Sequence, residues 1–296
     1  MHGKIVAGLA LAASLGVAQP VLAAPDWKAV AQALGKSGTE MPGGVYRVGL
    51  PRSDLKVTLD GVEIKPSLAL GSWVAFEAMG DKDAMVMGDL VLTQTEVNPV
   101  MLKLVENGIE ITAVHNHLLR SQPATMYMHI EGHGDPVKLA TAVNAGLRES
   151  QTPLSAASSG TPSTSINLDT SKVDQILGHK GKVSGGVYQV SVPRSETITD
   201  AGMQVPEAMG SAIAINFQPT GNGKAAITGD FVLVASEVNP VLRALRDNGI
   251  EVTALHSHML NEEPRLFFMH FWANDDVEKL ARGLRTALDK IHLASG

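Results

Sequence analysis

The feature that most constrains this chain is an internal duplication. About 23 of the 50 residues from Val86 to Asp135 are identical to the residues 141 positions later, far more than unrelated segments share by chance. Two copies of one fold are therefore expected. Upstream, two blocks recur at an offset of 142: Gly43–Tyr46 as Gly185–Tyr188, and Pro51–Ser53 as Pro193–Ser195.

The duplication divides the chain into segments. Residues 150–166 are rich in Ser, Thr, Pro and Ala, which is typical of a surface linker. They separate a first repeat domain, residues 25–149, from a second, residues 167–296. Residues 1–24 have a short basic start, an apolar run and a small-residue end, as signal peptides do. We therefore expect a soluble protein, exported to the periplasm or secreted, with no membrane insertion after signal removal.

Composition excludes several classes of function. Hydrophobic residues make up 44% of the chain, enough to form real cores, so a disordered chain is excluded. The absence of cysteine excludes disulfides, thiolate metal sites and a cysteine nucleophile. Aromatic residues are only 4% and the net charge is −6, so no nucleic-acid partner is expected.

Each copy predicts the same order of elements. In the first copy we expect a helix over 27–34, strands over 45–50, 73–78 and 86–93, a helix starting at Asn98-Pro99, strands over 109–119 and 125–131, and a closing helix over 136–147. The predicted fold class is α+β: two homologous domains, each an antiparallel sheet with packed helices and a β-α-β-β-α core.

Six of the ten histidines occupy three positions that both copies retain. Residues i and i+2 of a strand share a face, and a hairpin turning about Pro123 would place His129 opposite His117 and Glu131 opposite His115. Each domain is then expected to present three imidazoles to one ion. The alternative is a set of polar side chains on a solvated face. The six are His115, His117 and His129, and His256, His258 and His270.

Three imidazoles with an open coordination position suit a catalytic zinc site, and copper or iron is also compatible. Zinc is the metal that we expect first. The first copy adds Glu131, as a general base or ligand, and His133, as a ligand. The second copy has Trp272 and Asn274 instead. The two sites are therefore expected to differ, with tighter metal binding in the first copy.

Other polar residues recur in both copies. Glu96 precedes Asn98-Pro99 and is a candidate ligand, base or hydrogen-bond acceptor for a metal-bound imidazole. Arg52 and Arg194 each follow a proline at a strand end, where they would bind an anionic substrate or form a structural ion pair. The chain has no H-E-x-x-H, G-x-S-x-G, Walker A or dinucleotide-binding signature.

Four blocks of the first copy carry a family resemblance: Gly88–Leu92, Glu96–Val100, Asn107–His117 and Met126–Ile130. With their counterparts in the second copy, they resemble the LppY/LpqO family, also called DUF1259. The resemblance covers nearly the whole chain after the signal segment and implies a bacterial exported protein with no assigned activity. It supplies no catalytic residues. Mycobacterial members resemble lipoproteins, but this chain lacks the cysteine that a lipid anchor needs.

Three functions remain open at this point. The first is a metal-dependent hydrolase that acts on an unknown small ligand of the cell envelope, with Glu131 or Glu96 as the base. The second is a non-catalytic periplasmic protein that binds a metal or a small ligand. The third is a structural envelope protein whose histidines face solvent.

Overall fold

The computed structural model describes residues 25–80, 82–154 and 165–294. The expected signal peptide and most of the expected linker lie outside these residues. Each repeat forms a six-stranded antiparallel sheet with packed helices, which confirms the predicted α+β class. Within the described ranges, no helix has the length and apolarity that a membrane span requires.

The two repeats share one topology. The first sheet has the order β1 (Thr39–Glu40), β2 (Tyr46–Pro51), β5 (Gly71–Met79), β6 (Asp83–Thr93), β8 (Thr125–Gly134) and β7 (Glu110–His115), with helices α1 (Trp27–Leu34), α3 (Val97–Glu106) and α4 (Pro136–Leu147). The second has the order β9 (Lys182–Ser184), β10 (Val187–Val192), β13 (Ile213–Gly221), β14 (Lys224–Leu233), β16 (Phe267–Asp276) and β15 (Glu251–His256), with helices α5 (Thr170–Leu177), α6 (Ala235–Asp247) and α7 (Val277–Leu288).

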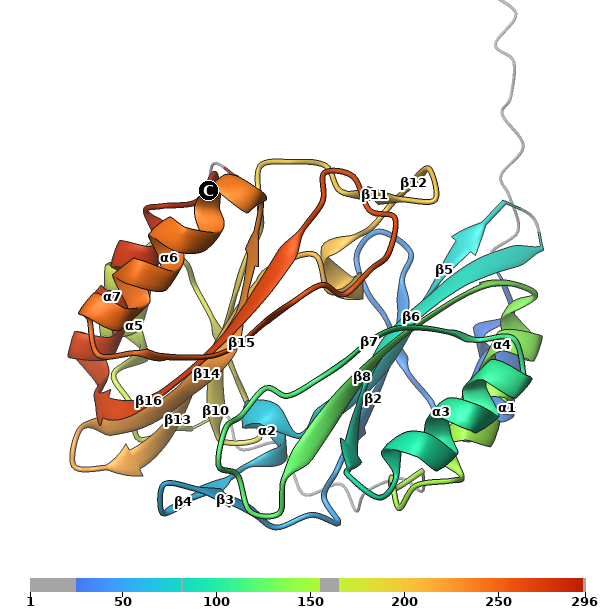
Figure 1. Cartoon of the computed structure of the whole chain (residues 1–296), viewed down its shortest axis with the longest axis horizontal. Helices are drawn as coiled ribbons and strands as arrows, with labels where there is room; N and C mark the ends of the chain where they lie inside the picture. Colours follow the sequence, from blue (N-terminus) through green and yellow to red (C-terminus); the bar gives the residue numbers. More distant parts are fainter. Residues whose placement is uncertain (1–24, 81, 155–164, 295–296) are drawn as a thin grey trace, which may run out of the picture.

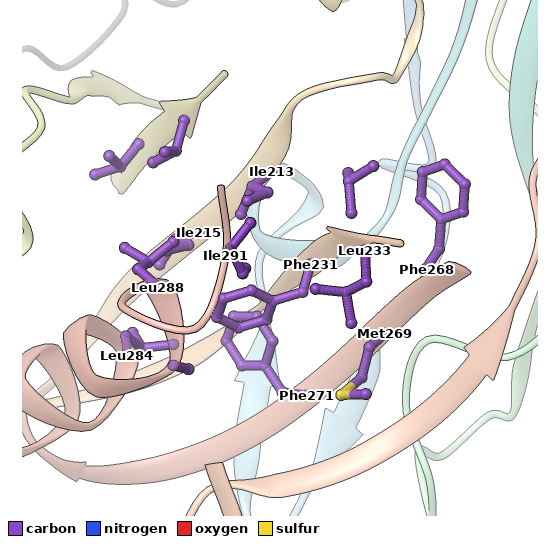
Figure 2. Close-up of a cluster of buried hydrophobic side chains, with 14 of the residues drawn as sticks. Ile213, Ile215, Phe231, Leu233, Phe268, Met269, Phe271, Leu284, Leu288 and Ile291 are labelled. Atoms are coloured by element: carbon purple, nitrogen blue, oxygen red, sulfur yellow. The ribbon is translucent and has the colours of Figure 1, made fainter. Parts of the chain in front are cut away.

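The helices cover the outer faces of the two sheets, and the inner faces meet at the centre of the molecule (Figure 1). Alternation along β16 produces this division. Met269 and Phe271 pack with Leu284 and Leu288 of α7 in a core without solvent exposure (Figure 2). His270 lies between them in the sequence and therefore faces the other repeat.

Several element boundaries differ from the sequence prediction. Helix α3 begins at Val97, ahead of the predicted Asn98-Pro99 start. The Glu96 carboxylate accepts a hydrogen bond of 2.8 Å from the backbone N–H of Thr93, which organises the turn before the helix. Strand β7 ends at His115 and not at residue 119. Helices α1 and α4 match their predicted ranges.

Each repeat also carries a short arm that the sequence pattern did not predict. The first arm comprises β3 (Val57–Leu59), β4 (Val62–Ile64) and α2 (Pro66–Ala69); the second comprises β11 (Thr199–Asp200), β12 (Met203–Gln204) and the 3-10 helix η1 (Glu207–Met209).

Each arm packs against the other repeat. Leu59 and Leu68 of the first arm belong to one hydrophobic cluster with Trp272 of the second repeat. Across the molecule, Met87 of the first sheet clusters with Val205, beside the second arm's β12. The arms therefore join the two repeats into one body.

Candidate metal centre

The six repeated histidines lie in a single cluster between the two repeats, and not in a separate site in each. We call it the histidine centre. Three pairs of rings meet across the boundary between the repeats, with ring centroids 3.6 to 3.7 Å apart: His115 with His256, His117 with His270, and His129 with His258.

The centre has an approximate two-fold symmetry. The His115–His129 centroid distance is 5.0 Å, and the equivalent His256–His270 distance is 4.9 Å. The aromatic neighbours follow the same symmetry, because His117 stacks on Tyr127 at 3.4 Å and His258 stacks on Phe268 at 3.3 Å.

The predicted hairpin register was wrong. His129 lies opposite Ala113 and not opposite His117, and a bulge lies between Ile111 and Ala113. The strand face was nevertheless correct, because a register error of an even number of residues leaves each side chain on the same face. His117 lies beyond the end of β7, in the loop that follows.

Hydrogen bonds across the boundary hold each H-x-H segment against the other repeat. Thr253 donates its hydroxyl to the carbonyl of His117 at 2.6 Å, and Thr112 donates to the carbonyl of His258 at 2.5 Å. Asn116 adds a bond of 3.0 Å from its side-chain amide to the Thr253 carbonyl. These bonds explain why the imidazoles of one repeat meet those of the other.

Asp89 and Asp230 are two further residues of the centre, and neither was among the predicted site residues. An oxygen of Asp89 lies 3.5 Å from Nε2 of His117, and an oxygen of Asp230 lies 3.2 Å from Nε2 of His258. Both aspartates lie inside long strands, β6 and β14. The Gly-Asp dipeptide that recurs in both copies was the available signal.

The glycine of that dipeptide has a packing reason. A Cβ added to Gly229 would lie 1.9 Å from the carbonyl oxygen of Ala214, so no larger residue fits. The Gly229 carbonyl lies 2.8 Å from Nδ1 of His270. With the proton on Nδ1, that nitrogen donates to the carbonyl and Nε2 retains its lone pair. In metal-binding histidines, a hydrogen bond from the ring nitrogen that does not bind the metal fixes the tautomer in this way.

The centre contains many buried polar atoms without a hydrogen-bond partner in the described part of the chain. Buried polar groups are normally satisfied, so this concentration is unusual. The atoms are Nδ1 and Nε2 of His115 and His256, Nε2 of His117, His129, His258 and His270, and Oδ1 of Asp89 and Asp230.

Burial also favours the neutral form of five of the six imidazoles. It lowers the pKa values of these five side chains, and neighbouring imidazoles lower all five further, because a second positive charge would repel the first. Burial raises the pKa of Asp230 to about 6 and that of Asp89 well above its usual range. Neutral imidazole is the form that binds metal. The five histidines are His115, His117, His129, His256 and His258.

The ring nitrogens fall into two sets that the two-fold symmetry relates. Within each set, one nitrogen per residue lies within 4.8 Å of the others. Each set takes the H-x-H pair of one repeat and the third histidine of the other. The sequence predicted sets from a single repeat, and one further group, Asp230 with His258 and His270, does come from the second repeat alone. One set is His115, His117 and His270; the other is His129, His256 and His258, to which His115 is also close enough to contribute.

Two predicted residues lie directly beside the centre. Glu131 follows His129 by two positions on β8 and shares its face. Its carboxylate lies 3.7 Å from Nε2 of His133, whose side chain is 34% exposed at the rim. In the second repeat Trp272 and Asn274 take these places, so the difference noted in the sequence is a difference between two sides of one centre.

The three remaining predicted residues lie in buried ion pairs. Arg52 has no exposed surface and binds Glu96 at 2.8 Å and Asp54 at 2.8 Å. Arg194 binds Glu237 at 2.7 Å in the same way. Arg52 and Arg194 therefore form structural ion pairs, which was the alternative to binding an anionic substrate. Glu96 is the partner of Arg52. All three groups are engaged within their own repeat.

Fold and site together define a class: a duplicated α+β protein whose two sheets enclose a shared centre of imidazoles and carboxylates suited to a metal ion. The family model described as Domain of Unknown Function (DUF1259) matches residues 28–149 and 171–290. The chain therefore belongs to the DUF1259 family, in two copies.

Other comparisons add little. Among curated protein sequences, none matches this chain. A solved structure of a trimeric bacterial microcompartment shell protein, PduB, is similar at 13% identity over 84% of this chain and 87% of that one, with a TM-score of 0.19. A likeness this low carries no argument about fold or function.

Proposed function

We propose that this protein binds transition-metal ions at the histidine centre. The observation that carries the proposal is the group of eight buried imidazole nitrogens without a hydrogen-bond partner among the described residues. Neutral imidazoles are good ligands for zinc, copper and iron, and the two aspartates would balance the charge of a divalent ion. Zinc is the first expectation, with copper or iron as alternatives.

The two symmetry-related sets give the centre a capacity of two ions. Each ion would be held by ligands from both repeats, so binding would also fasten the repeats together. Tautomer control by the Gly229 carbonyl supports this assignment, since it leaves Nε2 of His270 free to bind.

The test is metal analysis of protein purified without a histidine tag, followed by titration of the metal-free protein with Zn²⁺ and Co²⁺. We expect one or two ions per chain. The substitution His270→Ala should weaken binding by more than about 100-fold, because the loss of supporting residues alone costs 10- to 100-fold. His179→Ala is the matched control, since that side chain lies in the turn after α5 and belongs to no group of possible metal ligands among the described residues. Absence of stoichiometric binding, or equal loss in the two variants, would overturn the proposal.

A second candidate function is metal-dependent hydrolysis of a small envelope ligand. The observation that favours it is Glu131, a buried carboxylate beside the centre whose pKa is raised to about 7, first by burial and then by nearby carboxylates. A bound zinc ion supplies an activated water at neutral pH, and Glu131 would accept its proton. Zinc-dependent cleavage of simple esters or phosphate esters that is lost in Glu131→Gln, with zinc still bound, is the expected result.

The proposed location is the periplasm or the exterior of the cell, on the basis of residues 1–24. N-terminal sequencing of the protein recovered from an expressing bacterium tests it. A mature chain beginning near Ala24 or Pro25 is expected, whereas a retained N-terminus would contradict export through signal cleavage.

A further inference from the structure

The two sides of the histidine centre are equivalent by symmetry but chemically opposite. On one side, which we call the sealed end, Leu59 of the first arm lies near Trp272. On the other side, which we call the acidic end, Asp200 of the second arm lies near Glu131. The turns that follow Leu59 and Asp200 match, with φ of 48° at both Asp60 and Ala201, and Thr58 and Thr199 form equivalent bridges to the hairpin loops.

The sealed end is filled by protein. Leu59 and Trp272 are 1% and 3% exposed and belong to one hydrophobic cluster. The indole N–H of Trp272 donates to Asp60 at 3.1 Å. Arg120 binds both Asp60 and Glu251 at the surface of this end.

The acidic end has two buried carboxylates in the same places. Asp200 is 1% exposed and Glu131 is 7% exposed. Neither oxygen of Asp200 has a hydrogen-bond partner in the described part of the chain. Met87, which lies opposite Glu131 in the first sheet, clusters with Val205 beside β12. Asp200 pairs with Met203 of β12, so the two carboxylates lie at the same end.

The nearby positive groups compensate Asp200 only in part: the backbone N–H of Ala201 and the charges of His133 and Arg265 act on it, but none of them is a direct partner in the described part of the chain. Arg265 directs its guanidinium to Glu262 and to the carbonyls of Met259 and Leu260. His133 approaches Glu131 at 3.7 Å, which is longer than a hydrogen bond. Buried carboxylates without a partner are costly, so the geometry calls for a positive group from outside the chain.

We propose that the acidic end binds the cationic nitrogen of a small molecule whose other end reaches the histidine centre. This inference rests on the proposed metal-binding function. The ligand class is an alkylammonium or guanidinium compound that also carries a metal-binding donor. Glu131 lies two residues along β8 from His129, on the same face, so a short aliphatic spacer should join the cationic nitrogen to the donor.

An organic cation fits this end better than a second metal site. Among the described residues, no group of three ligand atoms within 4.8 Å includes Glu131 or Asp200, so the close coordination that a metal ion needs is not in place. An ammonium or guanidinium group has several N–H donors and forms charge-assisted hydrogen bonds with carboxylates that lie further apart.

The experiment uses a matched pair of probes on the Co²⁺-loaded full chain. Histamine carries an imidazole and an ammonium group; 4-propylimidazole replaces the ammonium by a methyl group. Binding is followed by the visible absorption of cobalt. We expect histamine to bind at least about tenfold more tightly, which is the effect of one charged hydrogen bond. Asp200→Asn and Glu131→Gln should each remove most of this preference, whereas Asp60→Asn at the sealed end should retain it.

The outcomes separate the two proposals. Equal affinity of the probes for the cobalt-loaded chain, or a full preference in Asp200→Asn, would overturn the acidic end as a cation site while metal binding stands. A chain that binds no cobalt would overturn the metal proposal, and the same probes on the metal-free protein then decide the inference. Thermal stabilisation by histamine alone, lost in Asp200→Asn, supports it; equal stabilisation by both probes contradicts it.

Discussion

The sealed end and the acidic end are built by equivalent strands and equivalent arms, and they border the same six imidazoles. One holds an indole and a leucine, and the other holds two carboxylates, although all four side chains are buried. The histidines remain paired while the residues two positions further along β8 and β16 differ. The shared part of the molecule is therefore the centre, and the two repeats have diverged in what surrounds it.

The largest effect on stability is expected when an acidic residue is introduced at the sealed end. Leu59→Asp would place an unpaired carboxylate against Trp272, and we expect a loss of more than about 5 kcal/mol in the free energy of unfolding, from lost apolar burial and charge desolvation together. Leu59→Ala, the control, should cost less, about 2–5 kcal/mol. Denaturant unfolding of both variants measures the difference. Equal losses would show that the sealed end tolerates charge.

Removal of the indole is expected to have the next largest effect. Trp272→Ala should lower the free energy of unfolding by about 3–5 kcal/mol, because it leaves a cavity among the residues of the first arm. Trp272→Phe keeps much of the apolar contact and should cost less. A loss below about 1 kcal/mol for Trp272→Ala would contradict a filled end.

The equivalent substitution at the acidic end should have the opposite sign. The pKa of Glu131 is raised from 4.5 to about 7 in the folded protein. Its ionised form therefore costs stability above pH 7, and this cost disappears as the pH falls from about 7 to below 4.5. Without ligand, Glu131→Gln should be more stable than the natural chain by up to about 3 kcal/mol at pH 8, and by less than about 1 kcal/mol at pH 5. Urea unfolding at the two pH values measures this. An advantage that grows on acidification would contradict the assignment.

The smallest effect is expected from the surface bridge over the sealed end. Arg120 is half exposed and binds Asp60 and Glu251, and exposed ion pairs contribute little. Arg120→Ala should lower the melting temperature only slightly, and the difference from the natural chain should shrink in high salt. A large and salt-independent change would mean that this bridge, and not the indole, holds the end closed.

Much of the fold could be predicted from local patterns. Periodic apolar residues and capping signals located helices α1 and α4, and alternation located the central strands. The arms were missed because their strands have only two or three residues, too short for a periodic signal. Helix α3 was placed late because Asn98-Pro99 resembles a helix start, whereas Glu96 fixes the preceding turn.

The site was only partly predictable for a different reason. Strand alternation placed the histidines on one face, but the pairing of His117 with His270 depends on how two sheets dock, which no local pattern encodes. Asp89 and Asp230 were recognisable only as a repeated Gly-Asp. Asp200 gave no signal, because its importance depends on Glu131 of the other repeat.

The covalent joining of the two repeats has a further consequence. A homodimer of identical subunits has a true two-fold axis, so both of its ends must carry the same residues. An indole that suits one end would then fill both, and a carboxylate pair would be duplicated in the same way. A fused duplicate escapes this constraint, since each half mutates independently. The asymmetry across the histidine centre is thus available to this single chain and inaccessible to any self-associating single-repeat ancestor.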